Sequence, residues 1–208
     1  MGKYLTSLET DFISSAIDPA KSNVIVDVGA EAGRFSLLAA NRKVAVISIA
    51  IDSYSLKRLK QKSTDVIVIQ ADARKTPLKD VLWTTVFVIE VLDYIPQLEE
   101  ALSECLRILK PASSLILSFG NQSSLKAKLR GLRGKTYLHS YSNVMQCLLK
   151  LGFKIEAKKG YTWLPFGRMS QSRLVPFLGG LEKILGLRRI SSLSPWLSCM
   201  PQSQAKWF

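Results

Sequence analysis

Short apolar runs rich in β-branched residues alternate with helical segments along most of this chain, and that alternation constrains its fold more than any other feature. Such runs are typical of strands that are buried on both faces of a parallel sheet. The pattern therefore predicts a doubly wound α/β sheet with right-handed crossovers. The predicted strands are residues 23–28, 44–51, 66–69, 86–91, 114–119, 153–157 and 194–200, and the predicted helices are residues 4–17, 34–41, 55–61, 97–109 and 144–151.

The segment 161–193 breaks this pattern, because it mixes aromatic residues, glycine, proline and arginine. We interpret it as a lid or flap inserted before the last strand, with a short amphipathic helix over 181–185. The last strand is expected at an edge of the sheet, since Pro195 and Pro201 are tolerated only there. We expect residues 1–208 to form a single domain.

Composition narrows the class of protein further. Three cysteines without a CxxC pair and a single histidine cannot build a zinc site of Cys/His spacing, so no metal site is expected. Unpaired cysteines of this kind indicate a reducing, intracellular compartment. The beginning of the sequence lacks an apolar signal segment, and the chain has no apolar run of about 18 residues. We therefore expect a cytoplasmic protein.

The net charge of +13 is concentrated in one half of the chain. Residues 111–208 contain 15 of the 29 Lys and Arg residues but only 2 of the 16 Asp and Glu residues. Such a surface attracts anions over a Debye length. It indicates either an anionic partner or a solvated basic face that keeps the protein soluble.

Residues 24–35 (VIVDVGAEAGRF) are expected to form a strand, a tight turn and a helix. Gly29 and Gly33 would let the backbone approach a ligand and let helix and strand pack closely. A dinucleotide site would need the spacing G-x-G-x-x-G, whereas the spacing here is G-x-x-x-G. Asp27, two residues before the first glycine, favours a ligand with a positive charge or hydroxyl groups over a pyrophosphate.

This segment resembles the first motif of class I S-adenosylmethionine-dependent methyltransferases of the type-11 kind. The family's acid-x-Gly-x-Gly-x-Gly pattern maps onto Asp27, Gly29, Glu31 and Gly33, with Glu31 in place of the middle glycine. The resemblance implies a Rossmann-like, seven-stranded, mostly parallel sheet with an antiparallel C-terminal edge strand. It also implies a methyltransferase with S-adenosylmethionine as cofactor.

Two later segments resemble the same family, in the same order. Asp72 and Ala73 follow the third strand, where the family uses a carboxylate for the adenine amino group and the next backbone N–H for the ring. Residues 107–111 (RILKP) resemble the run before the family's fifth strand, although Ala112 and Ser113 replace its glycine pair.

The chain departs from the family at two cofactor positions. The family acid that holds the ribose hydroxyls falls on Ala50, so we assign that role to Asp52, which can instead cap the helix that follows it. Glu31 has three interpretations: an acid favoured at a helix N-terminus, a partner for the methionine ammonium group, or a sign of weakened cofactor binding.

Methyl transfer needs a general base only when the nucleophile must lose a proton. The resemblance implies that Glu90, Asp93 and Tyr94 line the site, with Glu90 also contacting the cofactor and Tyr94 at a position where the family often has histidine. His139 is a further candidate base. Each has a structural alternative: Asp93 as a cap, Tyr94 as a packed ring and His139 as a satisfied polar residue.

The acceptor is expected to contact the basic and aromatic C-terminal half. Apolar side chains beside cations favour a small apolar or anionic acceptor, such as a lipid, a quinone-like molecule or an aromatic metabolite, with peripheral contact to an anionic membrane. RNA is the less favoured alternative, based on the basic residues 126–135. A methyltransferase-like binding protein without catalysis is a third possibility. The protein is expected to be a monomer or a homodimer.

Overall fold

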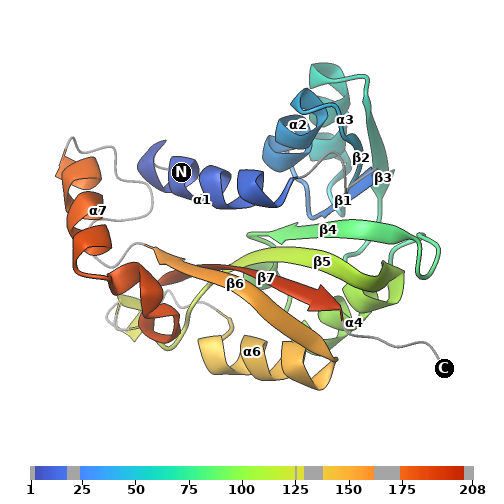
Figure 1. Ribbon diagram of the computed structural model, residues 1–208. Helices are drawn as coiled ribbons and strands as arrows, with labels where there is room; N and C mark the ends of the chain where they lie inside the picture. Colours follow the sequence, from blue (N-terminus) through green and yellow to red (C-terminus); the bar gives the residue numbers. More distant parts are fainter. Residues whose placement is uncertain (1–2, 18–23, 125, 129–137, 162–173, 204–208) are drawn as a thin grey trace.

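The computed structural model describes residues 3–17, 24–124, 126–128, 138–161 and 174–203. Figure 1 shows a single twisted sheet with helices on both sides. The seven strands lie in the order β3-β2-β1-β4-β5-β7-β6. They comprise β1 (Val24–Val28), β2 (Ala45–Ala50), β3 (Val66–Gln70), β4 (Trp83–Ile89), β5 (Leu109–Gly120), β6 (Phe153–Tyr161) and β7 (Trp196–Ser203).

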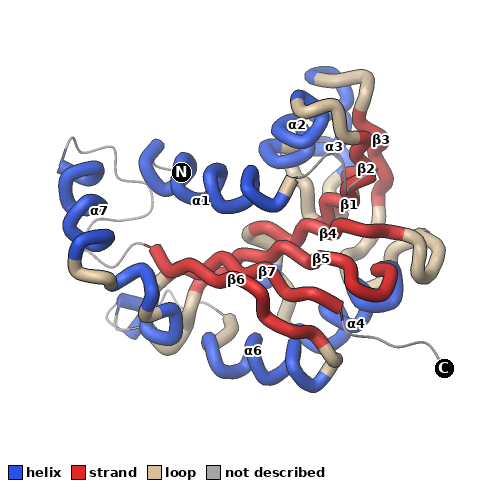
Figure 2. The backbone as a smooth tube through the Cα atoms, in the orientation of Figure 1, coloured by secondary structure: helices blue, strands red, loops and turns tan. Residues whose placement is uncertain are grey.

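Helices form the outer layers of the molecule (Figure 2). They comprise α1 (Lys3–Ala16), α2 (Arg34–Asn41), α3 (Ser53–Lys62), α4 (Leu98–Ile108), α6 (Tyr141–Lys150) and α7 (Leu174–Ile184), with short 3₁₀ helices η1 (Leu92–Tyr94), η2 (Leu187–Arg189) and η3 (Ser191–Leu193). None of the helices in the described parts of the chain is long and apolar enough to cross a membrane.

The alternation of side chains along β4 explains why both faces of the sheet are covered. Val86 and Val88 pack into a core formed with α4 and α6, whereas Phe87 and Ile89 pack into a second core formed with α1, α2 and α3. All four side chains are buried, because successive residues of a strand point to opposite faces. The predicted doubly wound α/β class and the seven-stranded, Rossmann-like sheet are therefore confirmed.

The last strand is antiparallel, as expected, but its predicted position at the sheet edge is wrong. β7 lies between β5 and β6 and is antiparallel to both, so the edge strand is β6. Pro195 precedes β7, and Pro201 pairs with Ile155 where the register of β6 shifts. A proline lacks the N–H that a regular ladder needs, and the irregular pairing at this shift accommodates it inside the sheet.

Several boundaries differ from the prediction. β4 ends at Ile89 instead of residue 91, because Glu90 adopts a left-handed conformation with φ 63°. β6 extends to Tyr161, four residues beyond the predicted end. The segment predicted as a lid or flap contains α7, η2 and η3, while residues 162–173 lie outside the described part of the chain. The lid function remains a prediction.

Candidate functional site

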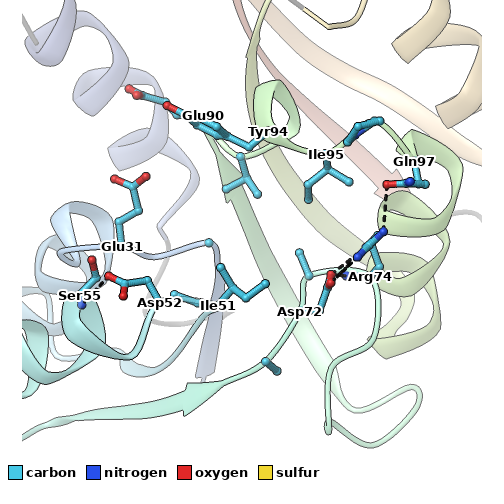
Figure 3. A pocket seen from close by; sticks show the side chains of 16 residues that line it. Glu31, Ile51, Asp52, Ser55, Asp72, Arg74, Glu90, Tyr94, Ile95 and Gln97 are labelled. Carbon is cyan, nitrogen blue, oxygen red and sulfur yellow. Dashed lines mark hydrogen bonds and ion pairs between the residues drawn. The ribbon is translucent and has the colours of Figure 1, made fainter.

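A cavity of about 540 Å³ opens at the carboxyl edge of the sheet, where β1 and β4 lie side by side. From β1 the chain crosses over to β2 on one side, and from β4 it crosses over to β5 on the other side. Ligands bind at such a switch point in open α/β sheets. A smaller cavity of about 210 Å³ shares Gly29, Glu31 and Glu90 with it. In Figure 3, Glu31 and Asp52 lie on one side of the larger cavity and Asp72 lies opposite them.

The turn after β1 requires glycine at both predicted positions. Gly29 and Gly33 have φ values of 79° and 78°, in the left-handed region. A Cβ at Gly29 would lie 2.1 Å from Val91 Cγ2, and one at Gly33 would lie 2.1 Å from Leu59 Cδ1. The turn therefore packs closely against the loop after β4 and against α3.

Asp27 lies behind this turn as a buried acid. Its carboxylate accepts a hydrogen bond from Ser36 Oγ, and Ser48 Oγ donates to Ser36 at 2.7 Å. Burial raises the pKa of Asp27 to about 6, against the lowering effect of the Ser36 hydrogen bond. Asp27 contributes to the smaller cavity, where it can face a cationic group.

Asp52 both caps a helix and lines the larger cavity. Its carboxylate accepts hydrogen bonds from the backbone N–H of Tyr54 at 3.1 Å and of Ser55 at 2.8 Å, as an N-cap does. The hydrogen bonds from Ser55 hold the pKa of Asp52 below its usual value. The cap and the ribose role are therefore compatible, because a carboxylate has further lone pairs for a ligand.

Asp72 and Ala73 line the opposite wall, and the structure gives Asp72 a partner that sequence reasoning missed. Arg74 Nε donates to Asp72 Oδ1 at 3.0 Å and Nη2 donates to Oδ2 at 2.6 Å, while Nη1 donates to Gln97 Oε1 at 3.0 Å. These hydrogen bonds lower the pKa of Asp72 to about 2. Arg74 thus joins the end of β3 to the start of α4, as the dashed lines in Figure 3 show.

Glu90 lies where the two cavities meet and is held by a second arginine. Arg34 Nη2 donates to Glu90 Oε1 at 2.9 Å and to Glu9 Oε2 at 2.7 Å. Glu9 is fully buried and also accepts from Ser118 Oγ at 2.8 Å. Two features of the sequence could have indicated these contacts. Arg34 directly follows the glycine turn, and Glu9 interrupts the apolar stripe of α1.

The four residues named as candidate bases separate into two groups. Glu90 and Tyr94 line the larger cavity, and the Tyr94 side chain is highly exposed at its mouth. Asp93 lies outside that lining: both its oxygens accept from the Gly120 N–H at 3.1 Å, and burial raises its pKa to about 6. His139 also lies outside it, buried and with Nε2 hydrogen-bonded to the Ile95 carbonyl at 2.8 Å.

The charges of the cavity suit a cationic ligand. Glu31, Asp52, Asp72 and Glu90 contribute four carboxylates to its lining, and Arg74 is its one cation among the described residues. Arg74 is already paired with Asp72. Carboxylates can hold an ammonium group, ribose hydroxyls or an adenine amino group. Within the described residues, no cluster of His, Cys, Asp and Glu could hold a metal ion.

Comparisons with known proteins bear on the family and the fold of this chain. Residues 26–117 match a family model described as a methyltransferase domain. A search of curated proteins gave no match.

Solved methyltransferases share the fold at low sequence identity. A protein from Methanosarcina mazei described as an S-adenosylmethionine-dependent methyltransferase is 13% identical, with a TM-score of 0.69 over 94% of this chain and 98% of its own. Another, from Archaeoglobus fulgidus, is 17% identical, with a TM-score of 0.68 over 96% and 94%. Geranyl diphosphate C-methyltransferase from Streptomyces coelicolor is 15% identical, with a TM-score of 0.69 over 96% and 81%.

These findings confirm the predicted resemblance. The family match and the fold indicate an enzyme that uses S-adenosylmethionine, and the carboxylate acceptors of the cavity fit this cofactor. Residues 26–117 therefore match a methyltransferase domain, and the chain has the fold of the S-adenosylmethionine-dependent methyltransferases.

Proposed function

We propose that this protein transfers a methyl group from S-adenosylmethionine to a small apolar acceptor at the mouth of the larger cavity. The observation that carries the proposal is the placement of four carboxylates and a glycine turn around one cavity at the carboxyl edge of the sheet. When bound there, S-adenosylmethionine supplies an electrophilic methyl group on a positively charged sulfur.

Different residues would contact the adenine, the ribose and the methionine end of the cofactor. Asp72 and Ala73 would hold the adenine, and Asp52 would accept hydrogen bonds from the ribose hydroxyls. Asp27, Gly29, Glu31 and Gly33 surround the methionine end, where two carboxylates favour an ammonium group. Gly29 lets the turn pack directly against Val91, since a Cβ at this position would collide with that side chain. This division follows the order of the strands, β3, β2 and β1, along the sheet.

The acceptor is inferred from the mouth of the cavity. Large apolar side chains stand exposed there, with Ile51 at 72% and Tyr94 at 76% of their full exposure, next to Val91, Ile95 and Pro96. Covering them with an apolar acceptor would remove apolar surface from water. The carboxylates of the same cavity repel an anion, so an anionic group on the acceptor would have to lie toward the basic C-terminal half. A lipid, a quinone-like molecule or an aromatic metabolite meets these conditions.

One structural neighbour supports an apolar acceptor. It is named a geranyl diphosphate C-methyltransferase, and geranyl diphosphate combines an apolar chain with an anionic group. At 15% identity this neighbour supports the class of acceptor and not the compound.

The chain's own contribution to the reaction is alignment and the exclusion of water. Holding two reactants in line can be worth roughly 7 to 11 kcal/mol of the barrier. If the nucleophile must lose a proton, Glu90 and Tyr94 are the candidate bases that line the cavity. The ion pair with Arg34 fixes the position of the Glu90 carboxylate at the cavity.

The test combines cofactor binding with methyl transfer. Calorimetry should detect S-adenosylmethionine binding to the native protein, and Asp72→Ala should weaken it at least about tenfold. Asp65→Ala is the matched control, because Asp65 is exposed near the opposite end of β3 and lies outside the cavity. Radiolabel from the methyl group should then appear in extracted lipids or small molecules. Absence of binding at millimolar cofactor would refute the proposed methyltransferase activity. Label in RNA alone would refute the proposed small apolar acceptor.

A further inference from the structure

The segment from α7 to η3 lies at the same edge of the sheet as the cavity. β6 runs in the same direction as β4 and β5, since both β5 and β6 are antiparallel to β7. The segment that leaves the carboxyl end of β6 and enters β7 must therefore begin and end at this edge. Figure 1 shows α7 standing beyond the end of the sheet to which β4 points.

Among the side chains of α7 that the structure describes, large apolar ones are exposed. Phe177, Ile184 and Leu185 are 68%, 80% and 65% exposed, and their spacing of i, i+7 and i+8 places them on one face. Gly179 and the acidic Glu182 are instead buried. A helix that covers a core turns its large apolar residues inward, so an apolar face exposed beside the described residues is a candidate contact surface.

The turns that follow α7 add two exposed apolar side chains, and exposed cations lie next to apolar residues in the sequence. Ile190 and Leu193 are 46% and 54% exposed. Lys183 and Arg189 are exposed and directly precede Ile184 and Ile190 in the sequence, and Glu182, the only acid of the segment 174–193, is buried. The exposed part of the segment therefore combines large apolar side chains with positive charge alone.

This positive charge indicates which kind of partner can cover the apolar side chains. A second copy of the chain would bring the same cations against each other, and each copy has a net charge of +13. An anionic lipid surface accepts apolar side chains between its acyl chains and pairs with the cations at its headgroups. Insertion into a fluid bilayer also needs no groove on the protein.

We propose that the α7 surface, defined as Phe177, Ile184, Leu185, Ile190 and Leu193 with Lys183 and Arg189, docks on bilayers that contain anionic phospholipid. Docking would bring the carboxyl edge of the sheet to the membrane, where an apolar acceptor dissolves. Only the role of docking, which is access to an acceptor in the membrane, rests on the proposed function. Docking itself requires neither cofactor nor methyl transfer.

Co-sedimentation of the full chain with vesicles tests the proposal. The native protein should bind vesicles of phosphatidylcholine mixed with phosphatidylserine, and should bind phosphatidylcholine alone far more weakly. Phe177→Ser combined with Ile184→Ser should lower the partition coefficient at least about tenfold, since each removes an inserted side chain. Lys183→Glu combined with Arg189→Glu should also lower it at least about tenfold.

Leu149→Ser is the matched control, because Leu149 is a 60% exposed apolar residue on α6, away from the α7 surface. It should bind vesicles like the native protein. Each variant should keep the native melting temperature, since the replaced side chains are exposed. Equal binding by the native chain and both double variants, or no binding to anionic vesicles, would overturn the proposal.

Two further measurements separate the outcomes. Light scattering that shows a dimer dissociated by Phe177→Ser with Ile184→Ser would overturn membrane docking in favour of a second copy. S-adenosylmethionine binding is measured by calorimetry in the absence of vesicles. Cofactor binding without vesicle binding refutes the docking surface alone, whereas vesicle binding without cofactor binding refutes the proposed function alone.

Discussion

Replacing Glu9 by glutamine should destabilise the protein strongly, although Glu9 lies outside both cavities. The Glu9 side chain is fully buried and accepts hydrogen bonds from Arg34 at 2.7 Å, Ser118 at 2.8 Å and Trp196 Nε1 at 3.3 Å. A hydrogen bond to a charged group contributes about 1.5 to 3 kcal/mol. Ser118 and Trp196 donate to Oε1 and Arg34 donates to Oε2. Glutamine keeps an oxygen at only one of these positions and turns its NH₂ group either toward Arg34 or toward Ser118 and Trp196.

The partial exposure of Arg34 limits the loss. Its side chain is 35% exposed and remains paired with Glu90, so water and Glu90 replace part of what Glu9 provides. We expect Glu9→Gln to lower the free energy of unfolding by about 2 to 3 kcal/mol. Glu9→Ala should cost more, about 3 to 5 kcal/mol, because it leaves all three donors without this acceptor.

Urea denaturation followed by circular dichroism measures this difference. Glu156→Gln is the control, because Glu156 forms an exposed ion pair with Lys154 and should change the stability very little. A double-mutant cycle of Glu9→Gln with Arg34→Gln should show a coupling of at least about 1 kcal/mol. A loss below about 0.5 kcal/mol for Glu9→Gln would refute the reasoning, since a buried carboxylate with three donors cannot be so replaceable.

Three other predictions concern single positions. Ala112 has φ 57° where the resembling family has glycine, so Ala112→Gly should raise the free energy of unfolding by about 0.5 to 1 kcal/mol in urea denaturation; a loss of stability would contradict this. Burial raises the pKa of Asp27 from its ordinary value of 3.8 to about 6 in the folded state, so its contribution to stability is complete below about pH 4 and is lost as the pH rises through about 6. Asp27→Asn should therefore flatten the stability profile between these pH values by roughly 3 kcal/mol, and an unchanged slope would show that Asp27 does not titrate there. Asp52→Asn keeps the helix cap but loses the charge, so it should weaken cofactor binding in calorimetry without changing the melting temperature, whereas Asp52→Ala should lower both; native affinity in Asp52→Asn would remove Asp52 from the ribose site.

The fold was predictable because its main signals are local in sequence. β-branched runs such as residues 24–28 and 86–89 are strands in the structure, and the conformations of Gly29 and Gly33 agree with the need for glycine inferred from their spacing. The position of β7 was not predictable from its prolines. The register shift of β6 that accommodates Pro201 depends on pairing between distant segments, which no local pattern encodes.

The same distinction applies to the candidate site. Asp72 and Asp52 could be named from the resemblance to the family, since each follows a predicted strand near the position of a family acid. The partners Arg74, Gln97 and Glu9 required knowledge of which side chains meet across the fold: Glu9 contacts Ser118, which is 109 residues away. Asp93 and His139 were candidate bases because their side chains can accept a proton. In the structure, Asp93 instead accepts a hydrogen bond from the Gly120 N–H, and His139 is hydrogen-bonded to the Ile95 carbonyl.

The most direct test of the account is a crystal structure of the protein grown with S-adenosylhomocysteine, the product form of the cofactor. We predict ligand density in the larger cavity, with the adenine next to Asp72 and Ala73 and the amino-acid end next to Glu31. Density for the nucleoside anywhere else in the molecule would contradict the account. So would side chains filling the cavity in crystals grown at saturating ligand.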